Sequence, residues 1–256
     1  MNLVQAPLRA FMQFWYPYVR MLNVLSPSIT IEGKRLVISP EVYKPLENEH
    51  AVVAYCKPGE RVLDLGCGSG VNAIFVAPLA REVVAVDISP AAVKNTQENC
   101  RLHGLKNVKV RKSDMFSKVD GEFDVILANP PYVAVSFDKE DKQFATSTRY
   151  LPSLFANASQ HLTKDGRLVV QFPIWVRRAV EAMAAEHGFR LVSLKRTPLK
   201  SLGLFLISLA YMQVGFRSAF YVFRYDPKMA PKGAGAPART RKAVARPVRK
   251  PALAAA

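Results

Sequence analysis

Four consecutive residues, Asn129, Pro130, Pro131 and Tyr132, carry the groups in this sequence that are best suited to chemistry. They follow residues 123–128, an apolar run that we interpret as a buried strand, and open α/β sheets place their chemistry at such strand ends. Asn129 offers a side-chain carbonyl, Pro130 offers a backbone carbonyl, and Pro131 has no N–H group to compete for them. Tyr132 adds a flat face on which a planar group can stack. These groups suit holding a planar NH2 nitrogen for alkylation; the alternative is a Pro-Pro turn that closes a strand.

A glycine-rich turn lies upstream of the segment Asn129–Tyr132, which we call the Asn129 corner. The apolar residues 61–65, which include Asp64, run into the sequence Gly66-Cys67-Gly68-Ser69-Gly70. Glycines let the backbone turn tightly and approach a ligand, and a helix is expected from about Val71. The spacing is G-x-G-x-G, whereas dinucleotide binders have G-x-G-x-x-G. We therefore expect a strand, a ligand-binding turn and a helix in succession.

Carboxylates follow the next two predicted strands. Residues 83–86 are apolar and end in Asp87, 21 residues after Gly66, where a carboxylate can bind ribose hydroxyls. A third strand is expected near residues 108–110, and Asp114 follows it. Because parallel strands end at one edge of a sheet, these carboxylates are expected near the glycine-rich turn.

Taken together, these residues resemble the class I S-adenosylmethionine-dependent methyltransferases over roughly residues 42–225. The resemblance implies an α/β fold with a Rossmann-like seven-stranded sheet whose seventh strand runs antiparallel. It implies that the glycine-rich turn surrounds the methionine portion of S-adenosylmethionine, that Asp87 binds the ribose and that Asp114 contacts the adenine amino group. The cofactor-binding residues expected on this basis are Asp64, Gly66, Cys67, Gly68, Gly70, Asp87, Ile88, Asp114, Met115 and Asn129.

The segment Val42-Tyr43-Lys44-Pro45-Leu46-Glu47 resembles the V-Y-x-P-x-E-D-T segment of glutamine methyltransferases that modify translation release factors. It departs from that pattern at Asn48 and Glu49, where Asp and Thr or Ser are expected. Bacterial members carry a longer helical N-terminal domain than this chain has. Shorter archaeal and eukaryotic members work with a small activating partner, so the resemblance implies that such a subunit is possible here.

Further elements are predicted from helix and strand signals. Ser89 is expected to cap a helix that has Pro90 at its first position and stops at Gly104. Pro78 is expected to end the helix after the glycine-rich turn early. A helix is also expected between residue 47 and the first core strand. Other helices are predicted at about 151–161 and 175–187, and other strands at 168–172, 189–194 and 219–225.

Length and charge predict one domain with tails: an extension (1–40), a methyltransferase domain (41–226) and a basic tail (227–256). Of the net charge of +16, the tail supplies eight basic residues and no acidic one. Its composition is typical of disorder, and two interpretations stay open: an arm that contacts RNA, ribosomes or DNA, or a solubilising extension. The three scattered cysteines show no metal-binding spacing and favour a reducing cytoplasm, and no secretory signal is recognised.

Two apolar segments allow several interpretations. The aromatic-rich N-terminus could lie on a membrane surface or cap the core, and capping is favoured; a hairpin is expected at 29–38. Residues 201–216 carry no charge and are too short for a membrane span of about 20 residues. This second segment is interpreted as a core helix or longer strands, as a wall or lid facing the substrate, or as a membrane contact.

Three functions remain open. The first is a protein glutamine N5-methyltransferase acting on a release factor or another translation protein. The second is an N6-adenine methyltransferase on RNA or DNA, because the corner suits adenine amines and the tail is basic. The third is a noncatalytic module that binds S-adenosylmethionine or RNA, against which the intact tetrapeptide argues. A natural-product acceptor also fits the apolar segment 201–216, and no histidine base is required by the proposed chemistry.

Overall fold

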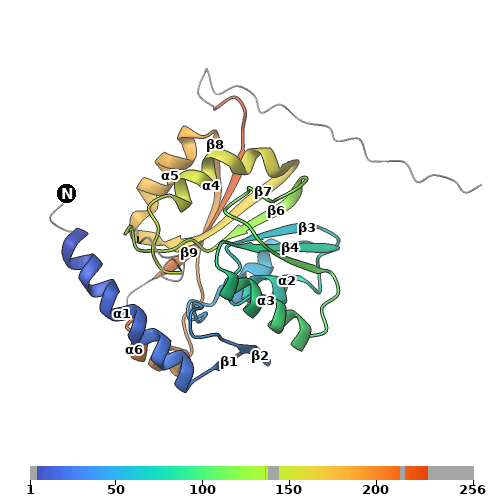
Figure 1. The fold of residues 1–256 in the computed structure, drawn as a ribbon. Coiled ribbons are helices and arrows are strands. Elements are labelled where there is room, and N and C mark those ends of the chain that lie inside the picture. The colour runs from blue at the N-terminus through green and yellow to red at the C-terminus, as the bar shows by residue number, and fades with distance from the viewer. Residues whose placement is uncertain (1–4, 136, 138–143, 214–216, 230–256) are drawn as a thin grey trace, which may run out of the picture.

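The computed structural model describes residues 5–135, 137, 144–213 and 217–229. The strands of its central sheet are β3 (Arg61–Leu65), β4 (Glu82–Asp87), β5 (Val108–Lys112), β6 (Phe123–Ala128), β7 (Leu162–Pro173), β8 (Phe189–Arg196) and β9 (Ser218–Tyr225). They lie in the order β5-β4-β3-β6-β7-β9-β8 (Figure 1). β3 to β7 pair in parallel, whereas β9 is antiparallel to both of its neighbours. The expected seven-stranded sheet with an antiparallel last strand is confirmed.

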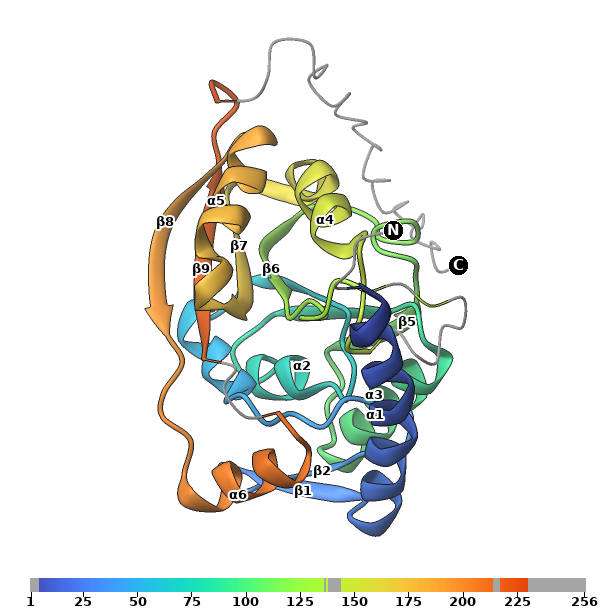
Figure 2. The ribbon, with the colours of Figure 1, turned by 90° about the vertical axis from the view of Figure 1, so that its left-hand side faces the viewer.

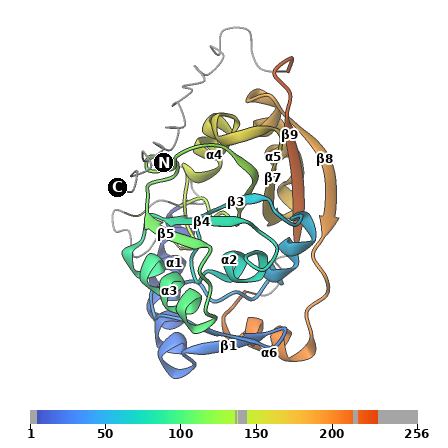
Figure 3. The same cartoon turned by 90° about the vertical axis from the view of Figure 1, so that its right-hand side faces the viewer.

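Helices cover both faces of this sheet (Figure 3). One face carries α2 (Val71–Val76) and α3 (Pro90–Leu102), and the other carries α4 (Tyr150–Ala158) and α5 (Arg177–Glu186). Successive strand residues point to opposite faces, so Val62 packs with the α2 side chains and Leu63 packs with Phe155 of α4. The inner strands β3, β4 and β6 are buried on both faces, which explains their nearly continuous apolar sequences.

Most local signals gave the correct element. Ser89 caps α3, its hydroxyl accepting the Ala92 N–H, and α2 ends at Val76, two residues before Pro78. The helix expected after residue 47 is instead the 3-10 helix η1 (Glu49–Tyr55). The helix predicted at 151–161 ends in a 3-10 turn, η3 (Ser159–His161), which follows α4. The helix predicted at 175–187 begins with another 3-10 turn, η4 (Ile174–Val176), which precedes α5.

The N-terminal segment forms α1 (Gln5–Leu25) and the hairpin of β1 (Ser28–Ile31) and β2 (Lys34–Val37). The expected hairpin is thus present, and Glu32 and Gly33 form its turn with positive φ angles of 44° and 75°. One face of α1 is buried against Leu46 and Tyr211 through Met12, Trp15 and Val19. This packing agrees with the capping interpretation, although the opposite side of α1 is exposed.

The uncharged segment near residues 201–216 contains α6 (Leu202–Ala210). The interpretation of this segment as a core helix or as longer strands is wrong, because Ser208 is the one fully buried residue of α6. Among the described residues, no helix is both long enough and apolar enough to cross a membrane. Most of the basic tail, residues 230–256, lies outside the described residues.

Candidate active site

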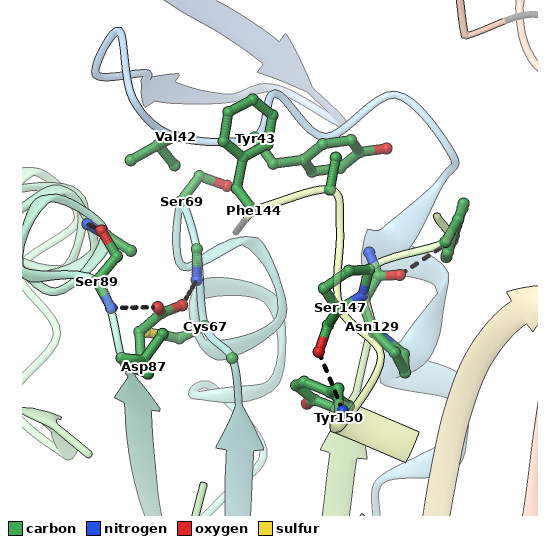
Figure 4. A pocket seen from close by; sticks show the side chains of 18 of the residues that line it. Val42, Tyr43, Cys67, Ser69, Asp87, Ser89, Asn129, Phe144, Ser147 and Tyr150 are labelled. Carbon is green, nitrogen blue, oxygen red and sulfur yellow. Dashed lines mark hydrogen bonds between the residues drawn. The ribbon is translucent and has the colours of Figure 1, made fainter. Parts of the chain in front are cut away.

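A pocket opens at the carboxyl ends of β3, β4 and β6 (Figure 4). It is lined by most of the residues selected from the sequence: Gly66, Cys67, Gly68, Asp87, Ile88, Asp114, Met115, Asn129, Pro130, Pro131 and Tyr132. Asp64 and Gly70 do not line it, although they belong to the same strand and turn. The parallel sheet therefore brings together the proposed donor-binding and acceptor-binding groups.

The glycine-rich turn forms one wall of the pocket. The N–H groups of Gly66 and Cys67 both donate to the Val86 carbonyl, at 2.8 and 3.0 Å, which ties the turn to β4. A Cβ at Gly66 would lie 3.3 Å from the Tyr150 hydroxyl, whereas a Cβ at Gly68 would meet nothing within 4 Å. The backbone at Gly66 thus packs closely against the Tyr150 side chain, whereas the space beside Gly68 is open.

Asp64 and Gly70 flank this turn in sequence and contact other parts of the protein instead of lining the pocket. Asp64 is fully buried, its Oδ1 accepts the Asn72 side-chain N–H at 3.1 Å, and burial raises the pKa of its carboxyl to about 7. Gly70 has a φ of 81°, and a Cβ there would lie 2.9 Å from Thr96 Cγ2. These contacts explain the residue types at both positions, and direct cofactor contact by either residue stays a prediction.

Asp87 joins the glycine turn to the start of α3 (Figure 4). Its Oδ2 accepts the Gly68 N–H at 3.0 Å, and its Oδ1 accepts the Ser89 N–H at 2.9 Å. Burial raises the pKa of this carboxyl, and the two backbone N–H groups oppose that effect. Each oxygen keeps a further lone pair, so Asp87 can still accept the hydroxyl groups of a ribose.

Asp114 differs from the expectation in one respect. Both of its carboxylate oxygens accept hydrogen bonds from Arg149, at 2.9 to 3.1 Å, and both side chains are about half exposed. An adenine amino group would therefore share this carboxylate with the guanidinium. Arg149 was not foreseen from the sequence.

At the acceptor end, the Tyr132 hydroxyl donates to Asn129 Oδ1 at 3.0 Å. Burial raises the pKa of Tyr132 well above its usual value, so this hydroxyl stays protonated and remains a donor. Its ring meets Phe172 edge to face, with ring centroids 5.3 Å apart. One lone pair of Asn129 Oδ1 is thus already used within the protein, and the second is left for an acceptor N–H. Stacking of the acceptor on Tyr132 stays a prediction.

Two glutamates add an acidic side to the acceptor end. Glu47 is buried, forms an ion pair with Lys200, and receives a weak hydrogen bond of 3.5 Å from the Ser218 hydroxyl. Glu49 is completely buried, and its Oε2 accepts the Glu47 N–H at 3.0 Å, while its Oε1 has no hydrogen-bond partner. Burial raises the pKa of Glu49 to about 7.

The pocket is acidic although the chain is basic. Among the described residues, the Asp, Glu, His, Lys and Arg side chains that line it are five acids and one base: Glu41, Glu47, Glu49, Asp87, Asp114 and Arg149. Two lining oxygens, Asn72 Oδ1 and Glu49 Oε1, are buried without a partner. This surplus of acceptors fits a ligand that carries positive charge and hydrogen-bond donors, as S-adenosylmethionine does with its ammonium, sulfonium, hydroxyl and amino groups. Within the described residues, no cluster of His, Cys, Asp or Glu is arranged to hold a metal ion.

Several lining residues were missed by the sequence interpretation. Tyr43 lies in the segment that matched the release-factor enzymes, and Glu49 lies two residues after it, at a position that departs from their pattern; the match could have marked Tyr43 as a lining residue. Phe144, Arg149 and Tyr150 also line the pocket. The sequence before α4 in which they lie has no clear helix or strand periodicity, so nothing marked them. The Tyr150 hydroxyl donates to the Leu65 carbonyl at 2.6 Å, which positions β3 directly before the glycine turn.

The solved structures that the fold resembles include methyltransferases. The ribosomal protein L11 methylase of Lactobacillus delbrueckii subsp. bulgaricus matches with a TM-score of 0.53 and 24% identity, over 74% of this chain and 84% of that one. The tRNA m1G37 methyltransferase of M. jannaschii matches with a TM-score of 0.57 and 15% identity, over 78% of this chain and 56% of that one. At these identities the likeness shows the class I methyltransferase fold.

Among sequence relatives, a protein of Methanocaldococcus jannaschii that is provisionally named a protein N5-glutamine methyltransferase is 41% identical over 115 residues. The match covers 44% of this chain and 58% of that relative. The ribosomal protein L11 methyltransferase of Caldicellulosiruptor bescii is 46% identical over 80 residues, which is 31% of this chain and 26% of the relative. The chain thus spans less than two thirds of each of these relatives.

The family comparison covers a larger share of the chain. Residues 51–183, which run from η1 through the glycine turn and the Asn129 corner into α5, match the model of the methyltransferase small domain. This region is about half of the sequence and contains the parallel core of the sheet with most of the pocket. The chain belongs to the methyltransferase small domain family.

Proposed function

We propose that this protein is an S-adenosylmethionine-dependent N-methyltransferase whose acceptor is a planar NH2 group, that of a glutamine side chain in a protein. One observation carries the proposal: the corner from Asn129 to Tyr132 and the turn from Gly66 to Gly68 line one pocket. The acceptor groups and the donor-binding groups come from different strand ends, so two molecules can meet between them.

S-adenosylmethionine would supply a methyl group that its sulfonium makes electrophilic. The residues that would hold it are Gly66, Cys67 and Gly68 at the methionine portion, Asp87 at the ribose, and Asp114 with Met115 at the adenine. Their carboxylates and the acidic pocket stabilise a cationic ligand over its neutral product, because charge is lost when the methyl group leaves.

The acceptor nitrogen is a poor nucleophile, because its lone pair is delocalised into the neighbouring carbonyl. The second lone pair of Asn129 Oδ1 and the Pro130 carbonyl can each accept one N–H of that group. These bonds hold the nitrogen in line with the methyl group and strengthen as it becomes pyramidal, which favours the transition state. Tyr132 fixes the orientation of the Asn129 amide through the bond at 3.0 Å.

Two findings favour a protein acceptor over adenine in a nucleic acid. The acidic and basic side chains that line the acceptor end are Glu47, which is paired with Lys200, and Glu49, so the described lining there offers no unpaired cation to the phosphates that flank a target base. Two of the sequence relatives are named for the methylation of proteins, one provisionally for glutamine and the other for ribosomal protein L11. A release factor or another translation protein is therefore the proposed partner, with or without a small activating subunit.

The test is transfer of a labelled methyl group to a cell lysate, with Asn129→Ala as the inactive variant and Asn157→Ala as its control. Asn157 lies on α4 outside the pocket lining. Wild type and Asn157→Ala should label a macromolecule that protease removes and nuclease does not. Acid hydrolysis should then release labelled methylamine, because an N-methylated glutamine amide is cleaved at its amide bond.

Other outcomes would contradict the proposal in different ways. Label that nuclease removes, recovered as methylated adenine, would establish the nucleic-acid alternative. Labelled protein that yields no methylamine would keep a protein acceptor but exclude glutamine. Label found only among small molecules would point to a natural-product acceptor, and absence of transfer with intact S-adenosylmethionine binding would favour the noncatalytic module.

A further inference from the structure

The outer side of α1 carries a stripe of large apolar side chains that the fold leaves exposed. Phe11, Phe14, Met21 and Leu25 are 45%, 62%, 51% and 74% exposed. With Tyr18 they follow the spacing i, i+3, i+7, i+10 and i+14, which places all five on one side of a helix. The residues that pack inward form a separate row, so this helix has two apolar sides.

A second exposed apolar surface is formed by α6 and by Leu199, three residues before it. Six large side chains there are between 38% and 93% exposed: Leu199, Leu202, Phe205, Leu206, Ile207 and Leu209. The helix contains no charged residue. A water-soluble protein rarely leaves such a sequence exposed, and contiguous apolar patches usually mark a protein or membrane contact.

The two surfaces join into one, which we call the apolar face. The Tyr18 hydroxyl donates to the Ala210 carbonyl at 2.8 Å, and Trp15 Nε1 donates to the Tyr211 carbonyl at 3.0 Å. Both helices lie on the side of the molecule that faces the viewer in Figure 2. Phe11 and Met212 belong to this surface and also line the pocket, so the face borders the pocket entrance.

The two chain segments that form the apolar face carry charge of one sign. Residues 1–31 and 187–225, which supply both helices and their flanks, contain no Asp or Glu. The basic residues nearest to the two helices in sequence are Arg9 and Arg20 within α1, Arg196 and Lys200 before α6, and Arg217 after it, and Lys200 is paired with Glu47. Apolar side chains bordered by cations are typical of helices that lie in the plane of an anionic bilayer surface.

We propose that the apolar face binds the surface of an anionic lipid bilayer, with α1 and α6 lying in the interface. A second copy of this chain is a poorer occupant, because it would bring two cationic borders together without any acidic partner. In this orientation the pocket entrance lies beside the lipid headgroups, which favours acceptors held at a membrane surface.

The experiment measures co-sedimentation of the full chain with vesicles of phosphatidylcholine alone or with one quarter phosphatidylglycerol. The variants are Phe14→Glu, Leu206→Glu and the double variant. Leu102→Glu is the matched control, because Leu102 is 50% exposed on α3 outside the apolar face. Each face variant should weaken binding to anionic vesicles about tenfold or more, since burying a side chain of this size contributes at least that factor. Circular dichroism and cofactor affinity should stay unchanged.

Salt separates the face from the basic tail. Attraction of the tail is electrostatic and should fall steeply at high salt, whereas the loss caused by Phe14→Glu and Leu206→Glu should persist. Face variants that bind like Leu102→Glu at both salt concentrations would overturn the proposal. Self-association that Leu206→Glu abolishes, without vesicle binding, would replace the bilayer by a second copy. Neither result bears on methyl transfer, which is measured separately.

Discussion

Glu49→Gln tests the most unusual electrostatic feature of the pocket. Glu49 is completely buried at the start of η1, and its Oε2 accepts the Glu47 N–H. Lys200, the nearby cation, is paired with Glu47 instead. Burial accordingly raises the pKa of Glu49 from 4.5 to about 7, and the charge of Glu47 adds to the effect. Glutamine has nearly the same shape, keeps an oxygen for the Glu47 N–H, and cannot ionise.

The sign and size of the effect follow from the difference in pKa. Between pH 4.5 and 7 the folded protein binds more protons at this site than the unfolded chain. Protonation of Glu49 therefore favours the folded protein. This stabilising contribution to the free energy of unfolding is fully present below pH 4.5 and is lost as the pH rises through 7. A difference of 2.5 pKa units (7 − 4.5) corresponds to roughly 3 kcal/mol. The free energy of unfolding of Glu49→Gln minus that of wild type should therefore increase by about that amount between pH 4.5 and pH 8.

Urea unfolding of both proteins at several pH values, followed by circular dichroism, measures this difference. Glu122→Gln is the control, because Glu122 is exposed before β6 and its substitution should change the free energy of unfolding little at any pH. A wild-type protein whose stability relative to Glu49→Gln is the same at pH 4.5 and pH 8 would refute the argument. It would mean that Glu49 stays ionised in the folded protein at neutral pH.

Three further substitutions probe the pocket and its support. Asn129→Ala should lower kcat about 100-fold or more while calorimetry shows unchanged donor affinity, and near-normal turnover would refute the acceptor role. Asp87→Ala should weaken S-adenosylmethionine binding at least tenfold, since a charge-assisted hydrogen bond contributes about 1.5–3 kcal/mol; equal affinity would remove Asp87 from the ribose site. Gly70→Ala should lower the free energy of unfolding by more than about 1 kcal/mol, because φ is 81° and a Cβ would lie 2.9 Å from Thr96. The Thr96→Ser change should restore part of that loss in thermal melts.

The sequence predicted those parts of the site that depend on local geometry. Gly66, Asp87 and Asn129 each follow an apolar strand, and parallel strands end at the same edge of a sheet. Knowing the three strands was therefore enough to bring these residues together. The cap at Ser89 and the early end of α2 are also local, because each depends on residues within one turn of helix.

Features that depend on packing between distant segments were missed. Arg149 reaches Asp114 across 35 positions, and Tyr150 reaches Leu65 across 85. Nothing near these residues in sequence marks them as pocket residues. The apolar composition of α6 was recognised, but composition does not say whether another element covers a helix. The 3-10 form of η1 likewise reflects its packing beside α2 and β7.

The distribution of charge connects the pocket with the rest of the molecule. A chain of net charge +16 encloses a pocket lined by five acids and one base among its described residues. A uniformly basic protein would repel a cationic methyl donor, so the acidic lining has to offset that long-range field at the site itself. The bases are left to the exterior, where the segments that form α1, α6 and their flanks carry no acid at all. Salt should consequently affect two steps in different ways: contacts of the exterior with anionic surfaces weaken strongly, whereas donor binding in the buried pocket is screened much less.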